Sequence, residues 1–169
     1  MPFRRIDLFA VPLAVLVAVL CGCGGASGGS GNAAATQLPQ GVTGSAVTGV
    51  YPAGPDEECC WTGPDVRFAV PADGAARTLQ LDVYEPQLGA FVTKHQLVSL
   101  VGARGTVTAS RAVAPGKPIT ISFPLAPADV KDGVASVHLR MTVSYVPKDA
   151  GLGPDVRRLA LILKRASAR

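Results

Sequence analysis

The stretch that decides the fold is Val137–Tyr145, which reads VHLRMTVSY. Apolar and polar residues alternate along it, so Val137, Leu139 and Met141 share one side of an extended chain. A period of two is that of a β-strand that buries one face and exposes the other to water. The stretch therefore predicts a half-buried strand, and similar patterns recur through most of the chain.

Six other stretches alternate in the same way or form short apolar runs separated by Gly and Pro, and Gly102–Gly105 is a candidate hairpin loop. They are Val66–Val70, Leu79–Val83, Gln96–Val101, Thr106–Val113, Ile119–Leu125 and Leu159–Leu163. No segment has a helical period. About seven strands in about 100 residues predict an all-β fold, an antiparallel β-sandwich of jelly-roll or Ig-like type with about 7–8 strands, over residues 42–169.

The core of this domain is predicted from the inward-facing positions of the strands. Large aliphatic and aromatic side chains at these positions would be covered by the opposite strands. The predicted core residues are Phe68, Leu79, Leu81, Val83, Ile119, Ile121, Phe123, Leu139, Met141, Val143, Leu159 and Leu161.

The N-terminal segment is typical of an export signal. Arg4 and Arg5 precede the apolar run Leu8–Leu20. The run has about 13 residues, whereas a membrane-spanning helix needs about 20. Residues 1–22 are therefore predicted to be a cleaved signal peptide.

The signal ends in Leu20-Cys21-Gly22-Cys23, which resembles the lipobox of bacterial lipoproteins. The resemblance implies cleavage before Cys23 and attachment of diacylglycerol to its sulfur, with palmitate among the acyl chains. Cys21 departs from the Ala, Ser or Thr usual at its position. An ordinary secretory signal that is cut elsewhere is the alternative.

Residues 23–41 are predicted to be a lipidated flexible tether, because Gly24–Ala35 is rich in Gly, Ser and Ala and carries no charge. The domain is thus expected to be anchored in a cell membrane and to lie outside the cytoplasm. Gly24 follows the lipidated cysteine in place of the aspartate of an inner-membrane retention signal. In a cell with two membranes this favours the periplasmic side of the outer membrane.

Three short motifs support a second resemblance. Cys60–Pro64, Phe123–Leu125, and Val146–Lys148 followed by Asp155–Leu159 are similar to jelly-roll accessory domains found beside bacterial glycosyltransferases and in cell-surface polysaccharide systems. The similarity covers about residues 51–165, and Ala160 departs from the Gly that often follows the leucine. It implies a carbohydrate or another cell-envelope polymer as partner.

Four residues are candidates for ligand binding, each with a structural alternative. Trp61 could be a platform for a sugar ring or a lid over the core. Asp155 and Arg157 could contact a ligand or pair with each other. His95, like His138 on the polar side of its strand, could be a ligand or base or a plain surface histidine.

Cys59 and Cys60 are adjacent and would be the remaining cysteines after processing and lipidation. An oxidising compartment favours a vicinal disulfide between them. Two buried thiols, or a redox or metal-binding pair, are the alternatives.

Charge and motifs argue against several functions. The chain has 16 Lys+Arg against 12 Asp+Glu, a net charge too small and scattered for nucleic acid. A basic C-terminus is expected to be a solvated strand edge, and the acidic run Asp56–Glu58 a solvated loop.

Since neither catalytic motifs nor zinc-ligand spacing occur, we expect a non-enzymatic module without cofactor or metal. Its predicted partners are the membrane, through the lipid, and a glycan. The alternative partner is an envelope protein that docks on a sheet edge.

Overall fold

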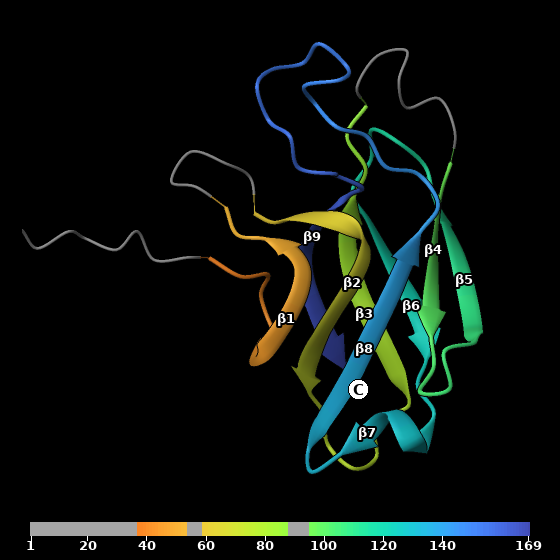
Figure 1. Cartoon of the computed structure of the whole chain (residues 1–169). Helices are drawn as coiled ribbons and strands as arrows, with labels where there is room; N and C mark the ends of the chain where they lie inside the picture. The colour runs from red at the N-terminus through yellow and green to blue at the C-terminus, as the bar shows by residue number, and fades with distance from the viewer. Residues whose placement is uncertain (1–36, 54–58, 88–94) are drawn as a thin grey trace, which may run out of the picture. The chain divides into compact units, whose positions relative to one another are not determined.

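The fold was analysed in a computed structural model that describes residues 37–53, 59–87 and 95–169 (Figure 1). The predicted signal peptide, Cys23 and the first part of the predicted tether lie outside the described residues. In the described ranges, no helix is long and apolar enough to cross a membrane.

The described strands form one antiparallel sheet with the order β5-β4-β8-β2-β9-β3-β6, in which β1 also pairs with β2 and β7 with β8. These seven main strands make a nearly closed, barrel-like sheet (Figure 1). The predicted all-β antiparallel fold is confirmed. The strands are β1 (Thr43–Tyr51), β2 (Trp61–Pro71), β3 (Thr78–Tyr84), β4 (Gln96–Val101), β5 (Val107–Val113), β6 (Ile119–Pro124), β7 (Val130–Lys131), β8 (Val134–Met141) and β9 (Ile162–Ala168), and the short 3-10 helix η2 (Pro127–Asp129) precedes β7.

Strand β2 connects the two halves of the sheet because it changes partner along its length. Its first residue, Trp61, pairs with Ile162 of β9, whereas Asp65–Pro71 pairs with β8. Strand β1 lies along β2 from Ala69 back to Trp61. The change of partner directs β9, β3 and β6 to one half of the sheet and β8, β4 and β5 to the other.

The core lies between these halves and contains every predicted core residue except Ile119 and Val143. Ile119 is 43% exposed because it begins β6, at one end of the strand order. Val143 is only partly buried because β8 ends at Met141. The side-chain amide of Gln96 explains why β8 ends before Val143. Its Oε1 accepts a hydrogen bond from Val143 N at 2.7 Å, and its Nε2 donates to Val143 O at 2.7 Å.

Strand β1 was not predicted, and its glycines and irregular register explain why. The ladder with β2 shifts twice, between Thr43 and Thr48 and between Thr48 and Val50. At Gly49, φ is +72°, and a Cβ atom would lie 2.1 Å from the carbonyl oxygen of Asp65. Only glycine fits this close approach. A bulged strand of this kind has no regular alternation to recognise.

The buried carboxyl group of Glu85 is an exception in this apolar interior. Glu85 follows β3 and is 1% exposed, and the backbone N–H of Gln96 donates to its Oε2 at 3.3 Å. Burial raises the pKa of Glu85 from 4.5 to about 7, although the hydrogen bond from Gln96 opposes the change.

We therefore expect Glu85 to make stability depend on pH. Because its folded pKa lies above its unfolded value, its contribution is fully present below about pH 4.5 and is lost as pH rises through about 7. Glu85→Gln, which cannot ionise, should be more stable than wild type at pH 8 by about 1–3 kcal/mol and should gain less at pH 5. Urea unfolding of both proteins at the two pH values measures this. An equal difference at both would contradict the assignment.

Candidate functional site

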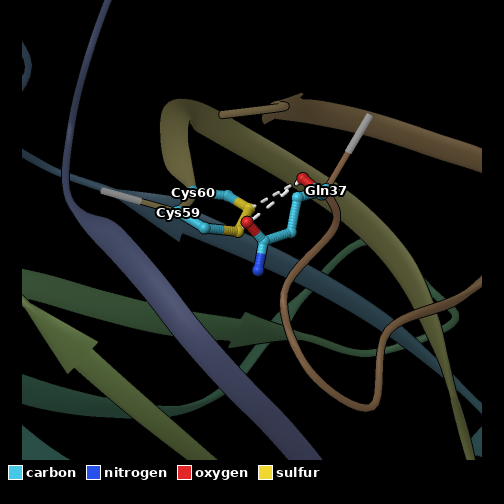
Figure 2. Close-up of a disulfide and its surroundings, with 3 residues drawn as sticks. All are labelled: Gln37, Cys59 and Cys60. Atoms are coloured by element: carbon cyan, nitrogen blue, oxygen red, sulfur yellow. Dashed lines mark hydrogen bonds between the residues drawn. A yellow bond between two sulfur atoms is a disulfide. The ribbon is translucent and has the colours of Figure 1, made fainter. Parts of the chain in front are cut away.

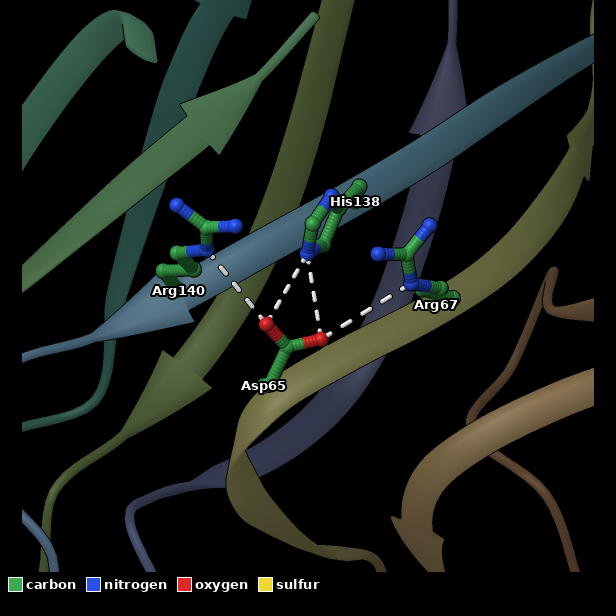
Figure 3. Close-up of polar contacts among 4 residues, drawn as sticks. All are labelled: Asp65, Arg67, His138 and Arg140. Carbon is green, nitrogen blue, oxygen red and sulfur yellow. Dashed lines mark hydrogen bonds and ion pairs between the residues drawn. The ribbon is translucent and has the colours of Figure 1, made fainter. Parts of the chain in front are cut away.

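Polar side chains gather on the outer face of β2 and β8. In the ladder between these strands, Asp65 stands opposite Arg140 and Arg67 stands opposite His138. Their neighbours Val66 and Leu139 are buried in the core. Because side chains alternate along a strand, the four polar residues lie together on the opposite face. We call them the Asp65 cluster (Figure 3).

The three basic side chains of the cluster surround the carboxylate of Asp65 (Figure 3). His138 Nε2 lies 3.0 Å from each carboxylate oxygen, and Arg140 Nε donates to Oδ2 at 3.4 Å. Arg67 Nε is 3.8 Å from Oδ1. The His138 side chain is 13% exposed, whereas the other three are about half exposed.

These contacts keep Asp65 ionised. Partial burial acts to raise the pKa of Asp65, but hydrogen bonds from His138 and Arg140, with the charges of His138 and Arg67, outweigh it and lower the pKa below 3.8. At neutral pH one carboxylate thus faces two permanently charged guanidinium groups. Before His138 is counted, the cluster already has more positive than negative charge.

An open cleft of about 660 Å³ lies over the same strands and includes Arg67, His138 and Arg140 in its lining. Small residues form much of the rest, and Lys131 and Asp129 add charged groups from β7 and η2. The small lining residues outside β2 and β8 come from β1, from the loop after β4 and from η2: Gly44, Ala46, Gly102, Ala103, Gly105 and Ala128. Small side chains leave room for a ligand next to Arg67, His138 and Arg140.

The predicted site residues Trp61, Asp155 and Arg157 form a separate group. The Trp61 ring meets Tyr145 edge to face, with ring centroids 6.1 Å apart. The Arg157 guanidinium lies 5.5 Å from the ring of Tyr51, the residue paired with Trp61 in the β1–β2 ladder. Contacts with Tyr145 and Tyr51 therefore bring Trp61, Asp155 and Arg157 together. We call these three residues the Trp61 group.

Asp155 and Arg157 are bound to each other within this group. Arg157 donates to Asp155 Oδ2 from Nε at 2.9 Å and from Nη2 at 2.7 Å. These hydrogen bonds lower the pKa of Asp155. Burial, with a smaller effect of the Asp155 charge, raises the pKa of Tyr145 to about 12. Both groups keep one charge state near neutral pH.

His95 is exposed immediately before β4, and no hydrogen bond described in the structure joins it to Trp61 or to the Asp65 cluster. Sequence reasoning considered His138 but missed its partners Asp65, Arg67 and Arg140. The available signal was the pair of alternating motifs Asp65-Val66-Arg67 and His138-Leu139-Arg140. Only the strand register shows that they face each other.

Cys59 and Cys60 are joined by a disulfide next to Gln37 (Figure 2). The Gln37 carbonyl oxygen lies 3.1 Å from Cys60 Sγ and 3.7 Å from Cys59 Sγ. Cys60 is fully buried, and its backbone exchanges two hydrogen bonds with Leu163 at 3.1 and 3.0 Å. The disulfide thus lies between the first described residues and β9.

No group of three or more His, Cys, Asp or Glu side chains that could hold a metal ion occurs in the described part of the chain. The acidic run Asp56–Glu58 lies outside it. Comparisons with protein-family models, curated proteins and solved structures find no match for this chain.

The disulfide predicts a defined thiol chemistry. In protein isolated without reductant, the peptide that contains Cys59 and Cys60 should weigh about two hydrogens less than its reduced form, because a disulfide lacks the two thiol protons. Both sulfurs should resist alkylation until reductant is added. Mass spectrometry with and without reductant measures both properties. Prompt alkylation of both cysteines before reduction would show that they are free thiols.

Proposed function

We propose that this chain is a membrane-anchored, non-catalytic binding module outside the cytoplasm that holds a carbohydrate or another cell-envelope polymer in the cleft over β2 and β8. The observation that carries the proposal is the cleft of about 660 Å³ with Arg67, His138 and Arg140 in its lining. This volume lies within the range of about 300–1,000 Å³ that is usual for ligand sites.

The chemistry of the lining suits a hydroxyl-rich polymer. Arginine and histidine provide hydrogen-bond donors on a sheet whose backbone is fixed by the β2–β8 ladder. The Gly and Ala residues around them leave the donors accessible. The cleft is open, so a long polymer could pass through it without its ends being enclosed.

The proposal includes a β-sandwich of the jelly-roll or Ig-like type. The change of partner along β2, from β9 to β8, supports this class. It divides the strand order into two groups of strands around one core, as in the two layers of a sandwich. The short motifs that resemble jelly-roll accessory domains support the same class. They also support a polysaccharide system as the setting.

The alternative function is an envelope-assembly lipoprotein that docks a protein on a sheet edge. The strand order ends at β5 and β6. Strand β6 ends in Pro124, which lacks a backbone donor, and Arg111 of β5 lies 5.6 Å from the ring of Phe123 on β6. Proline and charged side chains on edges oppose the addition of another strand. The cleft is therefore the better supported site.

Anchoring is proposed from the lipobox resemblance of Leu20–Cys23 and from the small, uncharged residues that follow it. Cys23→Ser removes the acylated sulfur, so the variant should lose labelled fatty acid and should be released as soluble or uncleaved protein. Metabolic labelling and membrane fractionation measure this, with wild type as the control. Fatty acid incorporation and membrane binding equal to wild type would exclude Cys23 as the lipid site.

The cleft itself can be tested by filling it. Ala103 is exposed in the loop after β4 and lines the cleft, whereas Ala112 is exposed on β5 and is not in its lining. Ala103→Trp should weaken binding to purified envelope polysaccharide at least about tenfold, because the indole occupies the ligand volume, a loss of about 1.4 kcal/mol. Ala112→Trp should bind like wild type. Equal binding by Ala103→Trp would place the ligand elsewhere.

A further inference from the structure

We infer that the polymer held in this cleft is an acidic polysaccharide, and that Arg67 and Arg140, with His138 between them, bind its carboxylate or phosphate groups. The inference rests on the proposed function and names the chemical class of its ligand.

The Asp65 cluster carries more positive than negative charge. Both guanidinium groups and His138 approach the single carboxylate of Asp65. A ligand that covers the cluster removes water from it, and a charge without a partner is costly in such a site. A neutral sugar would leave the surplus positive charge uncompensated, whereas an anionic group would neutralise it. Lys131 in the same cleft adds a further positive charge, which Asp129 in the lining offsets.

The two arginines of the cluster also keep hydrogen-bond donors available for a ligand. Arg67 and Arg140 approach Asp65 through Nε. The terminal nitrogens of both residues form no hydrogen bond to the rest of the described chain. Guanidinium groups present donors in a planar fork that matches the oxygens of carboxylate and phosphate. Two such groups in one cleft are therefore suited to an anion.

The role assigned to Asp65 is positioning. Its carboxylate accepts hydrogen bonds from His138 and Arg140 and pairs with Arg67, so it holds three groups that would otherwise repel one another. Asp65 itself is not part of the cleft lining. The cleft lining thus presents the basic groups to the ligand and does not include Asp65.

The test uses the full-length lipoprotein in neutral detergent micelles and measures its binding to polygalacturonate, phosphomannan and neutral dextran. We expect wild type to bind one or both acidic polymers more tightly than dextran, and to bind them less tightly as salt is raised. Arg67→Gln and Arg140→Gln should each weaken this binding about 10–100-fold, the size expected for a lost charged hydrogen bond. Arg140→Lys, which keeps the charge but not the fork, should have an intermediate affinity.

Arg165→Gln is the matched control. Arg165 is an exposed arginine on β9 whose Nε donates to Asp82 Oδ2 at 2.7 Å, and it is not in the cleft lining. It should bind like wild type, and far-UV circular dichroism of every variant should show an unchanged β-sheet.

Three outcomes would overturn the inference. Dextran binding that equals acidic-polymer binding and survives both Gln variants would leave the proposed function but refute an anionic ligand. Failure to bind any of the three polymers would refute both. Stronger recruitment to phosphatidylglycerol vesicles than to neutral phosphatidylcholine vesicles, lost in both Gln variants and without binding to either acidic polymer, would assign the basic groups to an anionic lipid surface.

Discussion

The register between β2 and β8 is the constraint on which both the core and the cleft depend. From Asp65 opposite Arg140 to Pro71 opposite Val134, the two strands remain in continuous antiparallel pairing. This register buries Val66 and Phe68 and places Asp65 beside the basic side chains on the other face. A shift by one residue would turn the buried side chains outward and the charged ones inward. The hydrophobic free energy of the core thus also fixes the positions of the polar groups.

The close approach of β1 to β2 completes the cleft. Gly49 comes so near the backbone of Asp65 that no side chain fits between the strands. The same bulged strand contributes Thr43, Gly44 and Ala46 to the lining of the cleft. The irregular register that left β1 unpredicted therefore also helps to form this side of the cleft.

Alternation predicted the strands well wherever one face is buried and the ladder is regular, as in Val66–Val70. It placed the end of β8 four residues too late because Gln96, a distant polar residue, replaces the strand partner at Val143. The apolar run Leu159–Leu163 was recognised, but its first residues are buried beside Tyr145 and Thr62, and β9 itself begins at Ile162. Such long-range hydrogen bonds leave no local signal in the sequence.

The candidate site was harder to predict than the fold for the same reason. Trp61, Asp155 and Arg157 were selected from short motifs, and the structure does bring them together through Tyr51 and Tyr145. The Asp65 cluster combines residues more than 70 positions apart in the chain. Each of its members, taken alone, looks like an ordinary polar residue on the exposed face of a strand. Their common position requires the register of two strands, which alternation alone cannot supply.

The Asp65 cluster and the Arg157–Asp155 pair beside Trp61 differ in how their charges are matched, and this difference favours the cleft as the proposed binding site. In the Trp61 group, one arginine meets one aspartate through Nε and Nη2, and its guanidinium also lies over an aromatic ring. Charge and hydrogen bonds are matched within the protein there, so a ligand would have to displace existing contacts. At Asp65, one carboxylate is shared by two arginines and a histidine. An incoming anion would add a hydrogen-bond partner to the arginines there without breaking an existing contact. This arrangement is the one expected of a surface that binds an anionic ligand.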